Sequence, residues 1–296
     1  MLGAAQSRRA QKAALCTMIQ QSGLTKSQAC EASEISRSNY YRWKRAHPPT
    51  KDITLRMVMQ EIALEFTRYG YRRITKELQR RGWCVNHKRV LRIMKEDNLI
   101  CLRKQFAPKT TNSNHGYVTY PNLATSLHVT DRNQLWVADI TYIRLRDEFV
   151  YLAVILDVYS RKCIGWELSR SIDTQLTLDA LHQALATRKS LGFSNLVHHT
   201  DQGVQYAATA YVECLKAHGI TISMSRKGNP KDNAFAESFM KTLKVEEVYL
   251  NDYATFEEAH DNLGTFIEEI YNTKRLHSGM GYLPPNEFEQ KIEITP

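Results

Sequence analysis

Two stretches of the chain carry carboxylates and lysines in an arrangement that could act on a phosphodiester. VHHTDQGVQY contains Asp201, and KGNPKDNAFAESFMKTLK contains Glu237. Because a helix turns by about 100° per residue, the second stretch, if helical, places Glu237, Lys241 and Lys244 on one stripe. Carboxylates bind divalent cations and lysines bind phosphate, and phosphodiester chemistry uses both. The alternative is a solvated helix face on which Glu237 pairs with the two lysines.

A third carboxylate, Asp139, lies inside the stretch LWVADITYIRL (135–145), whose alternating apolar residues predict a strand. A carboxylate in such a strand is costly unless it is paired or bound to a metal. Asp201 follows a predicted fourth strand, at the end where open α/β sheets place their ligands. We expect the first and fourth strands to be neighbours, which brings Asp139 and Asp201 together at one edge. The apolar face of the Glu237 helix is expected to pack beside them: Phe235, Phe239, Met240 and Leu243.

Three carboxylates that converge in this way can hold two Mg²⁺ ions about 4 Å apart, the arrangement for in-line attack on a phosphodiester. One ion would activate a water or a DNA 3′-hydroxyl, and the other would stabilise the leaving oxygen.

The pattern of strands and helices from residue 134 onward predicts an α/β fold. The segments 135–145, 149–159 and 162–168 are indicative of an antiparallel meander, and 149–159 is apolar throughout, as a central strand would be. A helix capped by Asp173 follows, and the rest of the region alternates strand and helix. The order βββαβαβα predicts a mixed five-stranded sheet with helices on both faces.

Charge is segregated along the chain. Residues 1–110 contain 23 lysines and arginines against 8 acidic residues, a net charge of +15, whereas the remainder has 17 against 23, a net charge of −6. A basic front half fused to a mildly acidic back half indicates that the front binds a polyanion. Nucleic acid is the expected partner, because no basic amphipathic helix with a broad aromatic face suggests a membrane surface.

Two helical units occupy this basic half, and both resemble helix-turn-helix domains. In the first, residues 1–48, Thr25 caps one helix and Ser36 caps a second at roughly 37–45. The second unit, residues 52–101, contains a helix capped by Asn86. The residues expected to reach bases or phosphates are Arg37, Asn39, Arg42, Lys44, Arg72, Arg73, Lys88 and Arg89. The alternative for the first unit is an ordinary helical hairpin with a basic exposed face.

Residues 102–132 lose all periodicity and are expected to be a linker before a core spanning 133–296. No apolar run long enough for a membrane span and no signal segment are evident. The six cysteines are scattered without metal-ligand spacing, which favours reduced thiols in the cytoplasm and argues against structural zinc.

The motifs WVADITYI, HHTDQGVQY and GNPKDNAFAESFMKTLK resemble those of the Asp–Asp–Glu transposases and retroviral-type integrases, which have an RNase H-like fold. Thirty-five residues separate Asp201 from Glu237, the spacing of the integrase-like branch. The tail YNTKRLHSGMGYLPP and the block GYRRI…VNHKRVLRIM resemble bacterial insertion-sequence transposases encoded in two overlapping reading frames. The resemblance implies that Asp139, Asp201 and Glu237 are the catalytic and metal-binding residues.

The same resemblance implies metal-dependent cleavage and strand transfer at transposon ends, with two Mg²⁺ ions per site and Mn²⁺ as a substitute. Lys241 and Lys244 match residues that usually contact DNA ends. Asn229 and Lys231, in the loop before the Glu237 helix, are also expected to contact DNA, with an ordinary loop role as the alternative. The implied partners are double-stranded DNA, both terminal inverted repeats and target DNA, and further copies of the chain in a dimer or larger assembly. The implied location is the bacterial cytoplasm, associated with the nucleoid.

Two rival functions remain open: an RNase H-type nuclease that never joins strands, and a non-catalytic DNA-binding regulator. Tandem site-reading domains argue against the first, and three carboxylates at the family spacing argue against the second. Six further residues have an open role. For Asp157 turn formation is favoured over metal binding, and for His198 and His199 sheet-edge packing is favoured over a direct role. For the other three, closure of the fold is favoured: Asn272, Arg275 and His277.

Overall fold

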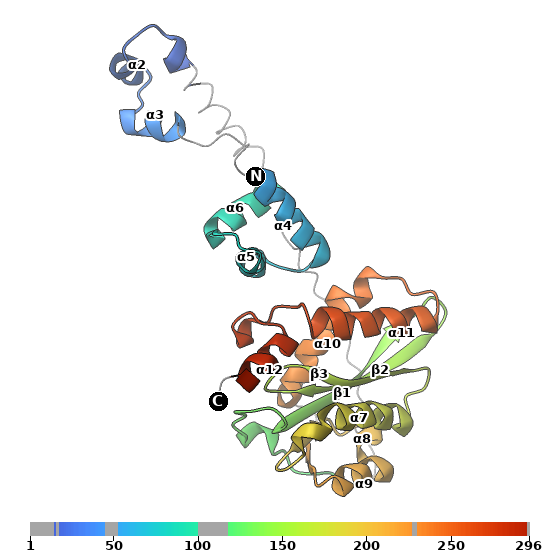
Figure 1. Cartoon of the computed structure of the whole chain (residues 1–296). Helices are drawn as coiled ribbons and strands as arrows, with labels where there is room; N and C mark the ends of the chain where they lie inside the picture. Colours follow the sequence, from blue (N-terminus) through green and yellow to red (C-terminus); the bar gives the residue numbers. More distant parts are fainter. Residues whose placement is uncertain (1–14, 16–17, 45–52, 100–117, 227–229, 295–296) are drawn as a thin grey trace. The chain divides into compact units, whose positions relative to one another are not determined.

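The computed structural model describes residues 15, 18–44, 53–99, 118–226 and 230–294, drawn as ribbons in Figure 1. The chain forms two compact units, Met1–Glu61 and Ile62–Pro296. The boundary falls inside helix α4 (Ile53–Glu65), so this helix contributes residues to both units. No helix in the described ranges combines the length and the apolar character needed to cross a membrane.

The first unit contains α2 (Lys26–Ala32) and α3 (Arg37–Lys44). Thr25 and Gln28 form a capping box at the start of α2, and the Ser36 hydroxyl accepts a hydrogen bond of 3.2 Å from the Asn39 N–H at the start of α3. Both predicted caps are therefore confirmed. The two helices enclose a small core of four residues: Ile19, Ala29, Cys30 and Tyr40.

The second unit begins with a helical pair, α5 (Tyr71–Arg80) and α6 (His87–Glu96). The Asn86 side chain caps α6 by accepting a hydrogen bond of 2.9 Å from the Lys88 N–H, as predicted. Apolar residues three and four positions apart on the two helices are buried: Ile74, Leu78, Val90, Ile93 and Met94.

The sheet has five strands in the order β3-β2-β1-β4-β5. The bounds are β1 (Leu135–Arg144), β2 (Phe149–Asp157), β3 (Cys163–Ser169), β4 (Val197–Thr200) and β5 (Thr221–Met224). β1 pairs antiparallel with β2 and parallel with β4. β2 pairs antiparallel with β3, and β4 pairs parallel with β5. The predicted mixed five-stranded sheet, including the β1–β4 neighbourhood, is confirmed.

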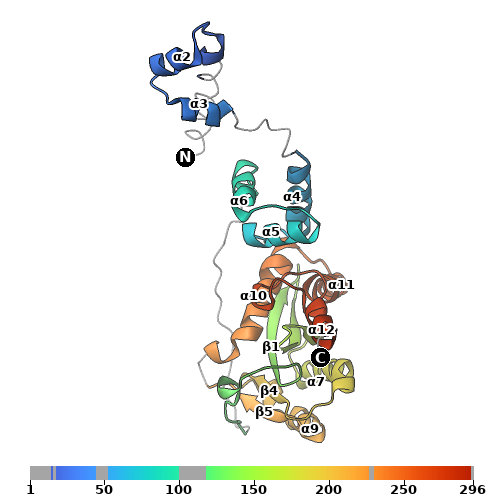
Figure 2. The same ribbon diagram turned by 60° about the vertical axis from the view of Figure 1, so that its left-hand side comes forward.

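Helices cover both faces of this sheet (Figure 1, Figure 2). One face packs on α7 (Thr174–Arg188) and α9 (Thr209–Ala217), around Trp136 and Ala138 of β1. The other packs on α10 (Ala234–Glu246) and α11 (Phe256–Thr265), around Leu135 and Val137. Because side chains alternate along a strand, Asp139 shares the α10 face with Leu135 and Val137.

Gly165 explains how closely α7 approaches β3. A Cβ atom at this position would lie 2.2 Å from the carbonyl oxygen of Ala180 and 2.8 Å from the backbone nitrogen of Ala184. Only glycine leaves room for the helix backbone at this distance.

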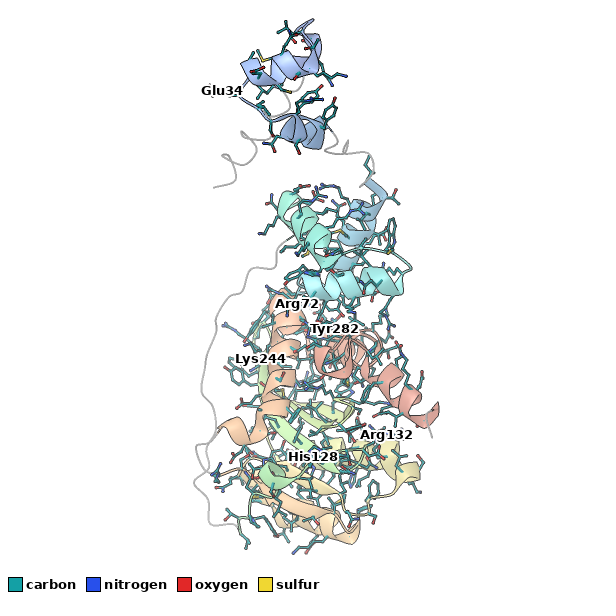
Figure 3. All side chains as sticks on the ribbon, turned by 90° about the vertical axis from the view of Figure 1, so that its left-hand side faces the viewer. Glu34, Arg72, His128, Arg132, Lys244 and Tyr282 are labelled. Atoms are coloured by element: carbon teal, nitrogen blue, oxygen red, sulfur yellow. The ribbon has the colours of Figure 1, made fainter. Side chains whose placement is uncertain are left out.

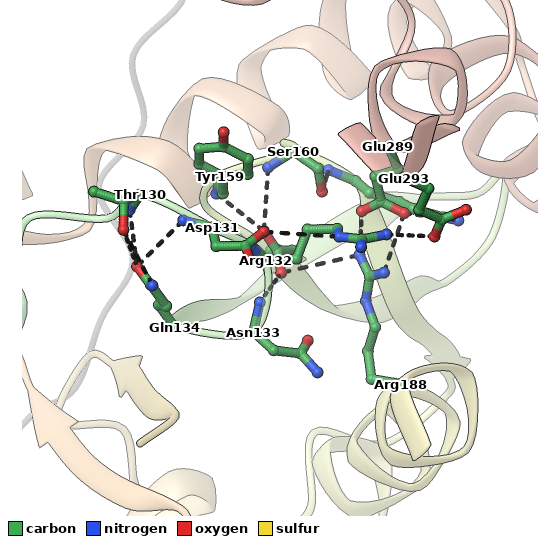
Figure 4. Close-up of polar contacts among 12 residues, drawn as sticks. Thr130, Asp131, Arg132, Asn133, Gln134, Tyr159, Ser160, Arg188, Glu289 and Glu293 are labelled. Atoms are coloured by element: carbon green, nitrogen blue, oxygen red, sulfur yellow. Dashed lines mark hydrogen bonds and ion pairs between the residues drawn. The ribbon is translucent and has the colours of Figure 1, made fainter. Parts of the chain in front are cut away.

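The C-terminal tail, predicted only as a Gly/Pro-punctuated stretch, contains a helix, α12 (Pro285–Ile294). Proline is favoured at the first position of a helix, which is where Pro285 lies. Figure 4 shows how α12 is tied to α7 and to the segment before β1. Arg188 of α7 forms a buried ion pair with Glu289, and Arg132 pairs with Glu293 at 2.6 Å.

The described part of the predicted linker, residues 118–132, packs on the five-stranded sheet. The Leu123 N–H donates a hydrogen bond of 2.9 Å to the Ser223 hydroxyl in β5. Tyr120 packs against the core on the α7 face, and Ala124 and Val129 pack against the core on the α10 face. This part of the segment therefore lies against the sheet on which the candidate site is built.

Candidate active site

Asp139 lies in the middle of β1, and Asp201 directly follows the end of its parallel neighbour β4. The pairing of Val137 with His199 sets the register of β1 and β4, and each aspartate follows two positions later. Both aspartates are partly exposed. The prediction that strand pairing brings these two positions to one edge is therefore consistent with the register.

Glu237 lies in the first turn of α10, on the face of the sheet that also carries Asp139. The start of this helix is fixed by Asn233, whose buried side-chain amide donates a hydrogen bond of 2.9 Å to the Ala138 carbonyl. The Glu237 side chain is exposed, and the helix packs on the sheet through four other residues: Ala236, Phe239, Met240 and Leu243.

The prediction that Phe235 belongs to this apolar face is wrong. Phe235 is 41% exposed, and the Arg161 guanidinium lies 5.3 Å from the centre of its ring. The contact face begins at Ala236 and continues at positions three, four and seven further on, so Phe235 lies at its edge.

The carboxylates of Asp201 and Glu237 act electrostatically on Asp139. The pKa of Asp139 is raised to about 7, mainly by burial and in part by these two carboxylates, whereas the hydrogen bond from the Ile140 N–H and the Lys244 ammonium oppose the shift. Partial burial also raises the pKa of Glu237. Negative charge from three separate elements is therefore concentrated around Asp139, as it is where carboxylates share a site.

Lys244 lies beside this group of carboxylates, two helical turns after Glu237. Its ammonium is 4.8 Å from the centre of the Tyr142 ring, a cation–π contact with β1. Burial lowers the pKa of Lys244, and the Asp139 carboxylate raises it. Figure 3 labels this residue on α10. Lys241 is exposed on the same helix.

The side chains of Asp139, Asp201 and Glu237 do not form a closed metal site. Among the described residues, no three acidic, histidine or cysteine side chains are close enough to hold an ion as they stand. The donor set nevertheless fits a hard divalent cation, because it consists of carboxylate oxygens whose mutual repulsion a cation would relieve.

His198 and His199 are fully buried in the sheet and pair with hydroxyl groups. His198 Nε2 lies 2.8 Å from the Tyr211 hydroxyl, and His199 lies 2.8 Å from Ser223 Oγ and 3.0 Å from Ser225 Oγ. Burial lowers the pKa of His198 to about 3 and also lowers that of His199. These contacts favour the sheet-packing interpretation for both.

Asp157 ties the turn that follows β2. Its carboxylate accepts hydrogen bonds from the backbone N–H groups of Asn133, Tyr159 and Ser160, at 2.8, 3.0 and 3.1 Å. This geometry favours the turn-forming interpretation over metal binding.

The three tail residues close the fold. Asn272 exchanges two hydrogen bonds with the Cys163 backbone, at 3.0 and 2.9 Å. Arg275 donates two hydrogen bonds of 2.7 Å to the Glu246 carboxylate at the end of α10. His277 packs edge-on against the Tyr271 ring.

The predicted DNA-contact residues are only partly described. Five are exposed: Arg37, Arg72, Lys88, Arg89 and Lys241. Asn39 and Arg73 are half-buried, and the Arg73 guanidinium lies 5.5 Å from the Tyr69 ring centre. Asn229 and the side chains of Arg42, Lys44 and Lys231 lie outside the described residues.

The strand order, with one carboxylate in β1 and another beyond β4, defines an RNase H-like core. The family described as "Integrase core domain" matches residues 129–230 and again 218–285, and the family described as "HTH-like domain" matches 51–106.

Two relatives place the chain more closely. It is 41% identical over 224 residues to the transposase for insertion sequence element IS904 of Lactococcus lactis, covering 75% of this chain and 88% of that protein. It is 35% identical over 270 residues to transposase InsF for insertion sequence IS3A of Escherichia coli, covering 88% and 93%. The chain therefore belongs to the insertion-sequence transposases with an integrase core domain.

One solved structure is also similar. A chain in the structure of the simian T-cell lymphotropic virus intasome in complex with PP2A regulatory subunit B56 gamma has 15% sequence identity and a TM-score of 0.46, covering 81% of this chain and 76% of that one.

Sequence reasoning missed Asn233 and Arg161. Asn233 lies in a polar loop where an asparagine is ordinary, and its partner Ala138 is almost a hundred residues upstream. No local pattern could have indicated either role.

Proposed function

We propose that this protein is a DNA transposase that cuts DNA at transposon ends and joins it to target DNA, with Asp139, Asp201 and Glu237 as its catalytic carboxylates. The observation that supports this best is the register of β1 and β4, which places Asp139 and Asp201 two positions beyond the same residue pair, with Glu237 on the helix that packs on this face of the sheet. The raised pKa of Asp139, to which Asp201 and Glu237 contribute, is also typical of a functional site.

The three carboxylates would hold Mg²⁺, two ions per site, with Mn²⁺ as a substitute. When bound, the metal would activate the attacking oxygen and stabilise the leaving oxygen of the phosphodiester. The chain's own contribution is positional: β1 and β4 hold the aspartates at one edge, and Asn233 holds the helix that carries Glu237 beside them.

DNA would be held by exposed basic residues in the two proposed helical domains, 1–48 and 52–101, and by Lys241 and Lys244 on α10. Lys244 suits contact with a phosphate near the reacting bond, because it lies within electrostatic range of Asp139. The proposed assembly is a dimer or larger on two paired transposon ends.

A strand-transfer assay tests the proposal with labelled DNA from the two ends of the mobile element and Mg²⁺. We expect joined product from the unmodified protein and none from Asp201→Asn, Asp139→Asn or Glu237→Gln. Asp179→Asn, on the outer helix α7, is the matched control and should retain activity. Hydrolysis without joining would favour a nuclease, and DNA binding without either reaction would favour a regulator.

A further inference from the structure

A cavity of about 160 Å³ lies beside the catalytic helix, in the second unit of the chain. Its walls come from α5, the end of β2 and the turn after it, α10 and the tail before α12. The charged and polar residues that the argument uses are Arg73, Arg161, Arg275 and His277.

Two of these arginines lack an acidic partner. In the described part of the chain, neither Arg73 nor Arg161 forms an ion pair or a hydrogen bond with a carboxylate. Arg161 rests on the Phe235 ring, and a Cβ atom at Gly279 would lie 3.0 Å from its Nη2, so glycine makes room for the guanidinium. Burial and the nearby Arg275 lower the pKa of Arg73, which an anion would reverse.

His277 also lines the cavity. Its Nδ1 lies 3.5 Å from Nη1 of Arg275, at the outer limit of a hydrogen bond. His277 is 6% exposed, and among the described residues its Nε2 has no hydrogen-bond partner. In the tautomer that carries the proton on Nε2, this nitrogen can donate to an incoming oxygen.

The acidic groups nearby are already compensated. Asp157 lines the cavity, but its carboxylate accepts three backbone hydrogen bonds and lies 3.9 Å from Arg188. Glu246 is held by the two hydrogen bonds from Arg275. The remaining charge in the cavity is therefore positive.

We propose that this cavity binds one phosphate group of the DNA backbone through Arg73 and Arg161, beside the ring of His277. Arginine is well suited to phosphate because its planar fork donates two parallel hydrogen bonds. The choice of DNA as the source of the phosphate rests on the proposed function. Asp157 is three residues along β2 from Val154, the partner of Asp139, so the cavity lies roughly 10 Å along the strands from that carboxylate.

The first experiment tests the anion site without DNA or catalysis. Binding of inorganic phosphate to the full-length protein is measured by calorimetry and by thermal unfolding, at constant ionic strength with chloride as the reference. We expect phosphate to bind and to stabilise the unmodified protein, and Arg161→Gln to weaken binding roughly tenfold. The control is Arg170→Gln, which removes an exposed arginine that lies 4.4 Å from the Phe256 ring centre. Equal phosphate binding by Arg161→Gln and the unmodified protein would overturn the site.

The second experiment identifies the source of the phosphate. Duplexes from the ends of the element carry a single neutral methylphosphonate, moved along each strand in turn. We expect one position at which the methylphosphonate lowers the affinity of the unmodified protein about tenfold. At that position the methylphosphonate should barely change the affinity of Arg161→Gln, because this variant already lacks the contact with the phosphate. Phosphate binding without any such position would refute the assignment to DNA. Failure of strand transfer alone would count against the proposed function and leave the phosphate titration unaffected.

Discussion

The side-chain amide of Asn233 donates a hydrogen bond of 2.9 Å to the backbone carbonyl of Ala138, the residue before Asp139. This bond joins the start of the catalytic helix to the strand that carries the first carboxylate. The distance between Glu237 and Asp139 therefore depends on a residue outside both the proposed metal-binding residues and the proposed DNA-contact residues.

Replacing Asn233 with alanine should slow cleavage more than it destabilises the fold. We expect a loss of about 1–2 kcal/mol in the free energy of unfolding, the usual cost of a buried hydrogen bond. The cleavage rate should fall by roughly a hundredfold, because small displacements of catalytic groups are costly. Single-turnover cleavage and chemical denaturation measure the two effects. Asn251→Ala, which removes hydrogen bonds to Glu247 only, is the control, and a normal rate in Asn233→Ala would refute the positioning role.

Replacing Asp139 with asparagine should stabilise the metal-free protein at high pH. The pKa of Asp139 is about 7 in the folded chain and 3.8 in the reference state, so the fold favours the protonated carboxyl. The ionised form therefore costs stability, increasingly as pH rises from 4 to 7 and fully above pH 7. We expect a gain on the order of 2 kcal/mol above pH 7 that disappears near pH 4. Unfolding curves in EDTA across this range provide the test, and a gain independent of pH would contradict it.

Replacing Lys244 with glutamine should act on Asp139 as well as on DNA. Removal of the ammonium raises the pKa of Asp139, because Lys244 now lowers it. The acidic limb of the rate–pH profile should therefore move to higher pH. The affinity for DNA ends should fall roughly five- to tenfold. The slope of log affinity against log salt concentration should decrease by about one, because one fewer counterion is released on binding. Lys216→Gln on α9 should change neither property. An unshifted pH profile in Lys244→Gln would show that Lys244 does not lower the pKa of Asp139.

Breaking the pair of Arg275 with Glu246 should destabilise the protein strongly. Both side chains are largely buried, so Arg275→Met alone leaves an unpaired carboxylate and should cost about 3–5 kcal/mol. The double variant Arg275→Met with Glu246→Leu should recover at least half of that loss, because no buried charge remains unpaired. Urea denaturation measures both variants. No recovery in the double variant would indicate a role for Arg275 beyond the pairing.

The sequence was sufficient to predict the sheet because its central strands are almost continuously apolar and its caps are ordinary. Thr25, Ser36, Asn86 and Asp173 all cap the helices assigned to them. The prediction that β1 and β4 are neighbours came from the order of strands and helices along the chain alone.

What could not be predicted depends on partners distant in the chain. Asn233 contacts Ala138, and Glu289 contacts Arg188, about a hundred residues away in each case. The position of Arg161 on the exposed Phe235 ring likewise arises only when two separate turns meet. The helix α12 was missed because glycines and prolines before it obscured a favourable Pro285 start.

The order of the strands along the chain has a consequence during synthesis. β1 emerges from the ribosome early, but its parallel neighbour β4 begins only at Val197, and α10 begins at Ala234. The helix that locks α7 through Glu289 comes last of all. A nascent chain therefore carries its proposed DNA-binding helices well before the helix with Glu237, its third proposed catalytic carboxylate. We therefore expect a partly synthesised chain that ends before α10 to bind DNA without cutting it.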